Sequence, residues 1–120
     1  MEWNTTEVNS EISKFLNRNP ASIYISGKVT GTTDYKERFA KAEKKLHEMF
    51  PNALIANPVR VTEPIDTFSY ATCMEVDLAL LRHCEAIYML SGWEDSEGAK
   101  IEYAFAKMYY LKIMKESDFN

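Results

Sequence analysis

Glu102 is the first residue whose type and surroundings indicate chemistry. It lies in the stretch 86–107, AIYMLSGWEDSEGAKIEYAFAK, which reads as an apolar strand, a polar loop and a helix. Gly98 and Ala99 precede Glu102 by about one helical turn, and Ala106 follows it by one turn. Because these neighbours are small, we expect space beside the Glu102 carboxylate that a ligand can enter.

A second carboxylate, Asp77, interrupts an apolar stripe on a helix predicted over 69–84. The stripe consists of Tyr70, Met74, Leu81 and Cys84. A carboxylate on an apolar face is costly unless it has a polar partner or faces a wet cavity. Buried charges concentrate at functional sites but also occur in structural ion pairs. The structural alternative is therefore that Asp77 caps or braces a neighbouring loop.

A loop rich in glycine and hydroxyl groups, 27–33, follows the strand predicted over 22–26. Asp34, with Glu37 three residues later, resembles the cap of the next helix. Backbone N–H groups beside a helix N-terminus can hold a phosphate or a carboxylate. The candidate ligand-binding residues here are Ser26, Gly27, Lys28, Thr30 and Gly31. A plain turn is the alternative, since glycine after a strand often serves only to turn the chain.

The elements that must position these residues alternate along the chain. Strands are predicted over 22–26, 53–56, 86–90 and 112–115, and helices over 34–50, 69–84 and 98–111. This alternation is typical of a small flavodoxin/Rossmann-like α/β domain, with about four parallel strands and helices on both faces. Right-handed crossovers predict the strand order 2-1-3-4. The last helix would pack through Ile101, Phe105 and Met108, 59–68 would form a loop, and the tail 116–120 would fray.

The loops after the first three strands should meet at one edge of the sheet, where open α/β sheets bind ligands. That edge would carry 26–31, Asn57 and 92–102. Trp93 would either stack on a base or pack over the strand end, and the residues alone favour neither use.

Composition limits the classes of partner. The 120 residues suit one domain, 1–120, with residues 1–20 as an N-terminal helical extension. The net charge of −4 argues against binding a nucleic-acid polymer. Cys73 and Cys84 do not form a disulfide framework or a metal motif, so we expect no metal and no other cofactor. We expect a cytoplasmic protein without a membrane partner, because no signal peptide or membrane-length apolar run is present.

Five blocks of sequence together resemble a family of uncharacterised bacterial and phage domains. They are IYISG at 23–27, Asn57-Pro58, Asp77-Leu78, CEAIYML at 84–90, and GWEDSEGAKIE at 92–102. That family is similar in turn to the nucleoside 2-deoxyribosyltransferases and the deoxynucleoside-monophosphate N-glycosidases.

The resemblance implies a role for each candidate residue. In the transferases, a glutamate in the pattern Gly, small, any, any, Glu attacks the anomeric carbon of the sugar. Residues 98–102 fit this pattern, so Glu102 would be the nucleophile, and Asp77 would assist at the base. The residues that would contact the substrate are Tyr24, Ser26, Gly27, Lys28, Thr30, Gly31, Asn57, Gly92, Trp93, Asp95, Ser96 and Gly98.

Two carboxylates also suit this reaction on chemical grounds. Breaking an N-glycosidic bond builds positive charge on the sugar and negative charge on the leaving base. One carboxylate must be ionised to stabilise or attack the sugar, while the other handles the proton of the base. If burial raises the pKa of Asp77, the two groups could divide these roles at neutral pH.

The resemblance therefore implies cleavage or transfer of the N-glycosidic bond of a (deoxy)nucleoside or nucleoside monophosphate. It also implies a homodimer or higher homo-oligomer, because a second subunit completes the site in related enzymes. A different class of function is a non-catalytic module that binds a nucleotide or an ADP-ribose-like signal. A third is a structural or interaction domain that uses its N-terminal helix.

Overall fold

Four short strands form one sheet at the centre of the molecule, and a computed structural model describes them within residues 18–62 and 69–119. The strands are β1 (Ser22–Ser26), β2 (Leu54–Ala56), β3 (Ala86–Met89) and β4 (Lys112–Lys115). All neighbouring pairs are parallel, and the order is β2-β1-β3-β4. This confirms the predicted four-stranded parallel sheet and its strand order.

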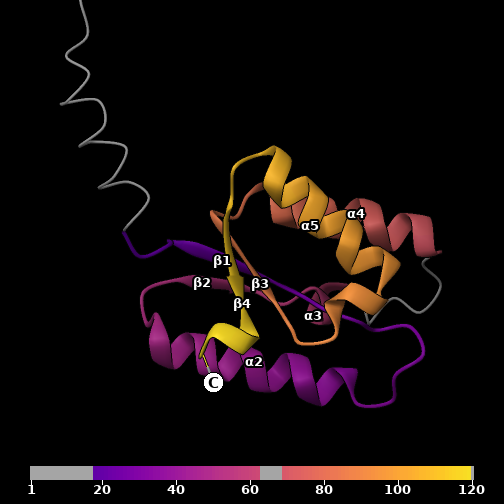
Figure 1. Ribbon diagram of the computed structural model, residues 1–120, viewed down its shortest axis with the longest axis horizontal. Helices are drawn as coiled ribbons and strands as arrows, with labels where there is room; N and C mark the ends of the chain where they lie inside the picture. The colour runs from indigo at the N-terminus through magenta and orange to yellow at the C-terminus, as the bar shows by residue number, and fades with distance from the viewer. Residues whose placement is uncertain (1–17, 63–68, 120) are drawn as a thin grey trace, which may run out of the picture.

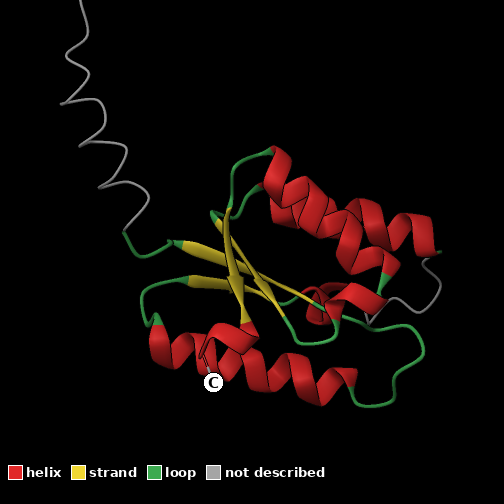
Figure 2. Ribbon diagram, viewed as in Figure 1, coloured by secondary structure: helices red, strands yellow, loops and turns green. Residues whose placement is uncertain are grey.

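The helices cover both faces of this sheet, as Figures 1 and 2 show. They are α2 (Tyr35–Met49), α3 (Pro58–Thr62), α4 (Tyr70–Arg82) and α5 (Glu97–Met108). Helix α2 lies against one face, and α4 and α5 lie side by side against the other. Two 3₁₀ helices, η1 (Trp93–Asp95) and η2 (Glu116–Phe119), complete the described elements. The small flavodoxin/Rossmann-like fold is thus confirmed.

The core beneath α2 follows the predicted helical spacing. Phe39, Ala42 and Leu46 are buried on one side of α2 and contact the strand residues Ile23 and Ile25. Alternate residues of β1 point to opposite faces of a sheet, so Tyr24 and Ser26 face the other layer. The first strand therefore supplies apolar packing to α2 and polar side chains to the side of α4 and α5.

Helix α5 packs mainly through residues other than those predicted, because only Phe105 of the predicted three packs against the core. Its buried residues are Ala99, Glu102 and Ala106, whereas Ile101 is 44% exposed and Met108 is 70% exposed. The small side chains of Ala99 and Ala106 let the helix approach the sheet closely, and Ile101 and Met108 are turned outward. Glu102 consequently points into the interior between α5 and β1.

Three further expectations are corrected by the structure. The Asp34 side chain makes no capping hydrogen bond and instead pairs with Arg38 at 3.2 Å. Residues 58–62 form α3 where a loop was predicted, although 63–68 lie outside the described residues. The tail was expected to fray, but residues 116–119 form η2. A 3.1 Å hydrogen bond from Lys45 Nζ to the Phe119 carbonyl holds η2 in place.

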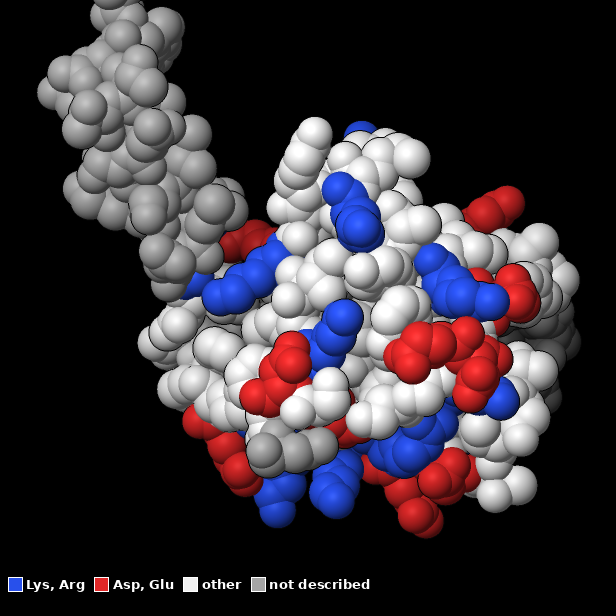
Figure 3. Space-filling model, in the orientation of Figure 1, with Lys and Arg blue, Asp and Glu red and all other residues white. Residues whose placement is uncertain are grey.

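The predicted N-terminal helix lies mostly in residues 1–17, outside the described part of the chain. None of the helices in the described part is both long enough and apolar enough to span a bilayer. On the face drawn in Figure 3, acidic and basic side chains are interspersed and do not separate into patches of one sign.

Candidate functional site

A clamp of two hydroxyl groups holds the Glu102 carboxylate. The Tyr24 hydroxyl donates to Oε2 at 2.5 Å, and the Ser26 hydroxyl donates to Oε1 at 2.7 Å. Both donors come from β1, because residues two apart on a strand share a face. Helix α5 brings the acceptor from the other side, so the clamp joins two elements far apart in the sequence. Hydrogen bonds to an ionised carboxylate are among the stronger ones in proteins.

This carboxyl group lies deep in the protein. Glu102 is 5% exposed, and both of its hydroxyl partners are also buried. Burial raises the pKa of the Glu102 carboxyl to about 7, because a charge loses its hydration in a low-dielectric interior. The hydrogen bonds from Tyr24 and Ser26 oppose that rise, since they favour the ionised form. Glu102 is thus a carboxyl group that titrates near neutral pH.

Tyr24 remains a neutral donor throughout this range. Burial, together with the nearby Glu102 carboxyl, raises its pKa well above the ordinary value. The proton of the short hydrogen bond therefore belongs to the tyrosine oxygen whenever Glu102 is ionised. Tyr24 was expected to contact substrate, and the structure places its hydroxyl on the proposed nucleophile.

Asp77 stands beside this clamp on α4. Its charge acts on both Glu102 and Tyr24, raising the pKa of each. Burial raises the pKa of Asp77 itself to about 6. Its Oδ1 atom is buried and has no hydrogen-bond partner among the described residues. The structural alternative, in which Asp77 caps or braces a loop, has no supporting hydrogen bond there.

Both carboxyl groups have raised pKa values, so burial does not by itself divide the two roles between them. The rise expected at Asp77 is present, and burial raises the pKa of Glu102 as well. Because the Asp77 charge acts on Glu102, the ionisation of one group depends on that of the other. A reaction that needs an ionised Glu102 and a protonated Asp77 must therefore have a proton on Asp77 when substrate binds.

The space expected beside Gly98 is already filled. A side-chain carbon built on Gly98 would lie 3.4 Å from both the Met74 sulfur and the Tyr70 hydroxyl oxygen. Both residues belong to α4, so α4 covers Gly98 at ordinary contact distance. The expected opening is therefore not found beside Gly98.

The glycine loop after β1 is shaped by its own backbone. Gly27 lies so close to β3 that an added side-chain carbon would be 2.9 Å from Cδ1 of Leu90. Gly31 has a positive φ of 80°, which glycine adopts at little cost. The carbonyl of Lys28 accepts a 2.6 Å hydrogen bond from Arg38, and Thr30 is exposed. None of these contacts brings the loop to Glu102.

The contacts of the remaining candidate residues are with neighbouring parts of the chain. The side-chain oxygen of Asn57 accepts from the Val59 backbone N–H at 3.1 Å, and the Ser96 hydroxyl accepts from Ala99 N–H at the start of α5. Gly92 has a φ of 90° where the chain enters η1. Trp93 packs against Tyr103 with ring centroids 4.5 Å apart, which favours packing over base stacking. Asp95 is exposed beside them.

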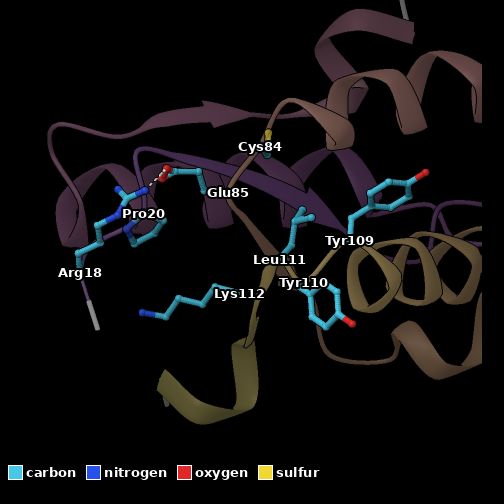
Figure 4. Close-up of a pocket in the computed structure, with 8 residues that line it drawn as sticks. All are labelled: Arg18, Pro20, Cys84, Glu85, Tyr109, Tyr110, Leu111 and Lys112. Atoms are coloured by element: carbon cyan, nitrogen blue, oxygen red, sulfur yellow. Dashed lines mark hydrogen bonds and ion pairs between the residues drawn. The ribbon is translucent and has the colours of Figure 1, made fainter. Parts of the chain in front are cut away.

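A groove of about 360 Å³ opens elsewhere, at the amino ends of the strands (Figure 4). Its lining residues precede β1, β3 and β4 and include Pro20, Glu85 and Leu111. Glu102 and Asp77 do not line it. Within 18–62 and 69–119, no group of three or more histidine, cysteine, aspartate or glutamate residues is placed to hold a metal ion.

Sequence reasoning found the carboxylates and missed their partners. Tyr24 and Ser26 were assigned to the substrate, although they are the buried residues of β1 whose side chains carry a hydroxyl group. Two polar side chains at i and i+2 on one face of a buried strand require a buried polar partner. That requirement was the available signal, and Glu102 satisfies it.

Comparison with known proteins identifies a family for this chain but does not identify a function. No curated protein and no solved structure matches this chain. The model of one protein family, a domain of unknown function (DUF4406), matches residues 21–115, from just before β1 to the end of β4. That range contains both the hydroxyl clamp and Asp77, and the chain belongs to the DUF4406 family.

Proposed function

We propose that this protein cleaves or transfers the N-glycosidic bond of a (deoxy)nucleoside or nucleoside monophosphate, with Glu102 as the nucleophile and Asp77 as the proton donor to the base. The observation that carries the proposal is that Asp77, on a separate helix, lies near enough to Glu102 for its charge to raise the pKa of the Glu102 carboxyl. Glu102 is oriented by two hydroxyl donors, and Asp77 keeps a buried oxygen with no partner in the described structure.

The chemistry follows from the protonation state of the pair. With one proton on Asp77, an oxygen of Glu102 attacks the anomeric carbon while the bond from that carbon to the base nitrogen breaks. The bonding electrons leave with the base, and the Asp77 proton neutralises the developing charge on it. Water, or the nitrogen of a second base, then displaces Glu102 from the sugar. The first acceptor gives hydrolysis and the second gives transfer.

Asp77 offers the more accessible side of the pair. It is half-buried, whereas Glu102 is 5% exposed with both oxygens hydrogen-bonded. A substrate approaching between α4 and α5 would therefore have to displace the packing of Tyr70 and Met74 over Gly98. We include in the proposal a homo-oligomer in which a second copy completes the site, as the resemblance implies.

The burial of Glu102 also favours a second candidate function. A carboxyl group enclosed this tightly can serve as a fixed internal anchor in a module that binds a nucleotide or an ADP-ribose-like signal without turnover. Stabilisation by a nucleotide in a thermal-shift assay, with no product formed, would support this candidate over the enzyme.

The enzyme is tested by incubating the protein with a panel of deoxynucleosides and their 5′-monophosphates and measuring free base by chromatography. A parallel incubation with a second free base detects transfer. The comparison variants are Glu102→Gln, which keeps the size of the side chain, and Glu97→Gln on the exposed side of the same helix.

We expect base release by the wild type and by Glu97→Gln, and at least a thousandfold less by Glu102→Gln. Release that is equal in Glu102→Gln and in the wild type would rule out a nucleophilic Glu102. A wild type that releases no base from any member of the panel would count against the enzyme altogether.

A further inference from the structure

We propose that Ser26 is a positioning residue for Glu102: its hydroxyl fixes Oε1 and favours the ionised carboxylate, and it does not bind the substrate. The catalytic role of this bond rests on the proposed function, whereas its effect on the ionisation of Glu102 does not. It replaces the role that the resemblance implies, in which Ser26 belongs to a substrate-binding loop.

The hydrogen-bond geometry favours this role. A serine hydroxyl has one hydrogen to donate, and Ser26 already donates it to Oε1 at 2.7 Å. Ser26 is 1% exposed, so its hydroxyl does not face solvent. Its backbone carbonyl accepts from Leu90 N–H at 2.8 Å, which ties the end of β1 to the chain after β3. Ser26 is thus held in place from both sides.

The position of Ser26 on β1 distinguishes the two oxygens of Glu102. Tyr24 lies two residues earlier, about 6–7 Å deeper along the strand. Ser26 is the last residue of β1 and stands at the carboxyl edge, where open parallel sheets bind ligands. We therefore assign Oε2, held by Tyr24, as the anchored oxygen and Oε1, held by Ser26, as the oxygen that attacks.

The charges that surround Glu102 make such a donor necessary. Asp77 on α4 repels the ionised form of Glu102, while β3 presents only the uncharged Ile87 and Met89 on this side of the sheet. Tyr24 and Ser26 are the polar groups of β1 that face the carboxyl group. Among the described residues, no cation is paired with Glu102, and the hydrogen bonds to its carboxylate come from the two hydroxyls.

A bond to the attacking oxygen has a consequence that a purely structural bond lacks. The negative charge on Oε1 decreases as it bonds to the sugar, so the Ser26 bond stabilises the ionised starting state more than the transition state. Removal of the hydroxyl should therefore lower the fraction of ionised Glu102, and it should not slow the reaction at pH values where Glu102 is ionised with or without the bond. The expected signature is a loss of rate at acidic and neutral pH that disappears at alkaline pH.

The test is a titration of the Glu102 side-chain carboxyl by ¹³C NMR in protein labelled at glutamate, without substrate. The Glu102 signal is assigned by its loss in Glu102→Gln. The variants are Ser26→Ala and the near-isosteric Ser26→Cys, whose thiol is a weaker donor. Ser22→Ala is the matched control, because Ser22 lies on the same strand and bonds Glu85 N–H and the His83 carbonyl instead.

We expect the midpoint of the Glu102 titration to rise by about one pH unit in Ser26→Ala and by less in Ser26→Cys, with no change in Ser22→Ala. Where base release is detectable, Ser26→Ala should lower its rate up to about tenfold below pH 7 relative to the wild type and should not lower it above pH 9. An unshifted Glu102 titration in folded Ser26→Ala and Ser26→Cys would overturn the inference, whatever the activity. A wild type without activity would instead overturn the proposed function and leave the titration result valid.

Discussion

The Tyr24 hydroxyl donates a 2.5 Å hydrogen bond to Oε2 of Glu102 and joins residues 78 apart in the sequence. This bond connects the central strand β1 to the helix that carries the proposed nucleophile. It lies in an interior where both partners are at most 5% exposed. The same contact therefore bears on the stability of the fold and on the ionisation of the site.

Replacement of Glu102 by glutamine should change how stability depends on pH. The pKa of Glu102 is raised in the folded protein, from 4.5 to about 7. Between these values the folded state holds a proton that the unfolded state has released, so the free energy of unfolding falls as pH rises. At about 1.4 kcal/mol per pH unit, the loss is about 3 kcal/mol. Glu102→Gln has no titrating group at this position, so it should not lose this stability.

Urea denaturation at pH 4.5 and at pH 8 measures this effect. The stability of Glu102→Gln relative to the wild type should rise by about 3 kcal/mol between the two conditions. The control, Glu97→Gln, should show no comparable change, because Glu97 is exposed on the same helix. A constant difference between Glu102→Gln and the wild type at both pH values would show that the Glu102 pKa is not raised.

Removal of the tyrosine hydroxyl should destabilise the protein, and more so at alkaline pH. Tyr24→Phe leaves Oε2 of Glu102 buried without its donor, at a cost of about 1–3 kcal/mol. The cost should be larger at pH 8 than at pH 5, because the ionised carboxylate depends on the donor more than the neutral acid does. Paired urea titrations at the two pH values measure it.

Tyr103→Phe is the matched control, since Tyr103 is half-buried on α5 and packs against Trp93. It should change stability by less than Tyr24→Phe at both pH values. Equal destabilisation of the two variants, or a Tyr24→Phe cost that does not vary with pH, would argue that the hydroxyl bond does not act on the ionised form of Glu102.

Replacement of Asp77 by asparagine should have opposite effects on ionisation and on turnover. The Asp77 charge raises the pKa of Glu102, so Asp77→Asn should lower that pKa and extend ionisation of Glu102 to more acidic pH. The variant cannot deliver a proton to the leaving base, so base release should fall by about a hundredfold or more. The Glu102 NMR titration and the chromatographic assay measure the two effects.

Glu75→Gln, an exposed change on the same helix, is the control for Asp77→Asn. It should leave both the titration and the rate close to the wild type. If Asp77→Asn lowers the Glu102 pKa yet keeps full activity, Asp77 is a neighbour of the nucleophile and not the proton donor.

A methyl group added at Gly27 should strain the strand end that positions Ser26. In Gly27→Ala the new carbon would lie 2.9 Å from Cδ1 and 3.0 Å from Cβ of Leu90, which is itself buried in the core. Overpacking of this kind costs about 1–3 kcal/mol. Thermal unfolding should detect the loss, whereas Gly31→Asn, in an open position with a φ of 80°, should cost less. A Gly27→Ala variant as stable as the wild type would show that Leu90 moves aside freely.

The strand order was predictable from the sequence because it depends on the alternation of elements. Four apolar runs separated by helical periods leave few parallel arrangements, and β2-β1-β3-β4 was among them. The position of Glu102 in the interior was less predictable. Helical periodicity favoured Ile101, Phe105 and Met108 as the buried face of α5, and only Phe105 of these packs against the core. The close approach to β1 selected the smaller Ala99 and Ala106 instead.

The candidate site was predictable only in its two acidic residues. Asp77 could be singled out because a carboxylate in an apolar stripe breaks a local pattern. The partners of Glu102 could not, because hydrogen bonds between residues 76 and 78 positions apart depend on how a helix seats on a sheet. The packing of Tyr70 and Met74 over Gly98 likewise arises between two helices, so it could not be predicted from the hydrophobic pattern of either helix.

The most direct test of the account is a search for the sugar on Glu102 itself. A 2′-deoxy-2′-fluoro nucleoside slows both displacements, because fluorine destabilises positive charge at the anomeric carbon, and a good leaving base keeps the first displacement faster than the second. Intact-mass and peptide mass spectrometry after incubation should reveal one added fluorinated sugar on the peptide that contains Glu102, and none in Glu102→Gln. A protein that gains no mass from any such nucleoside, or that carries the sugar on another residue, would contradict a nucleophilic Glu102.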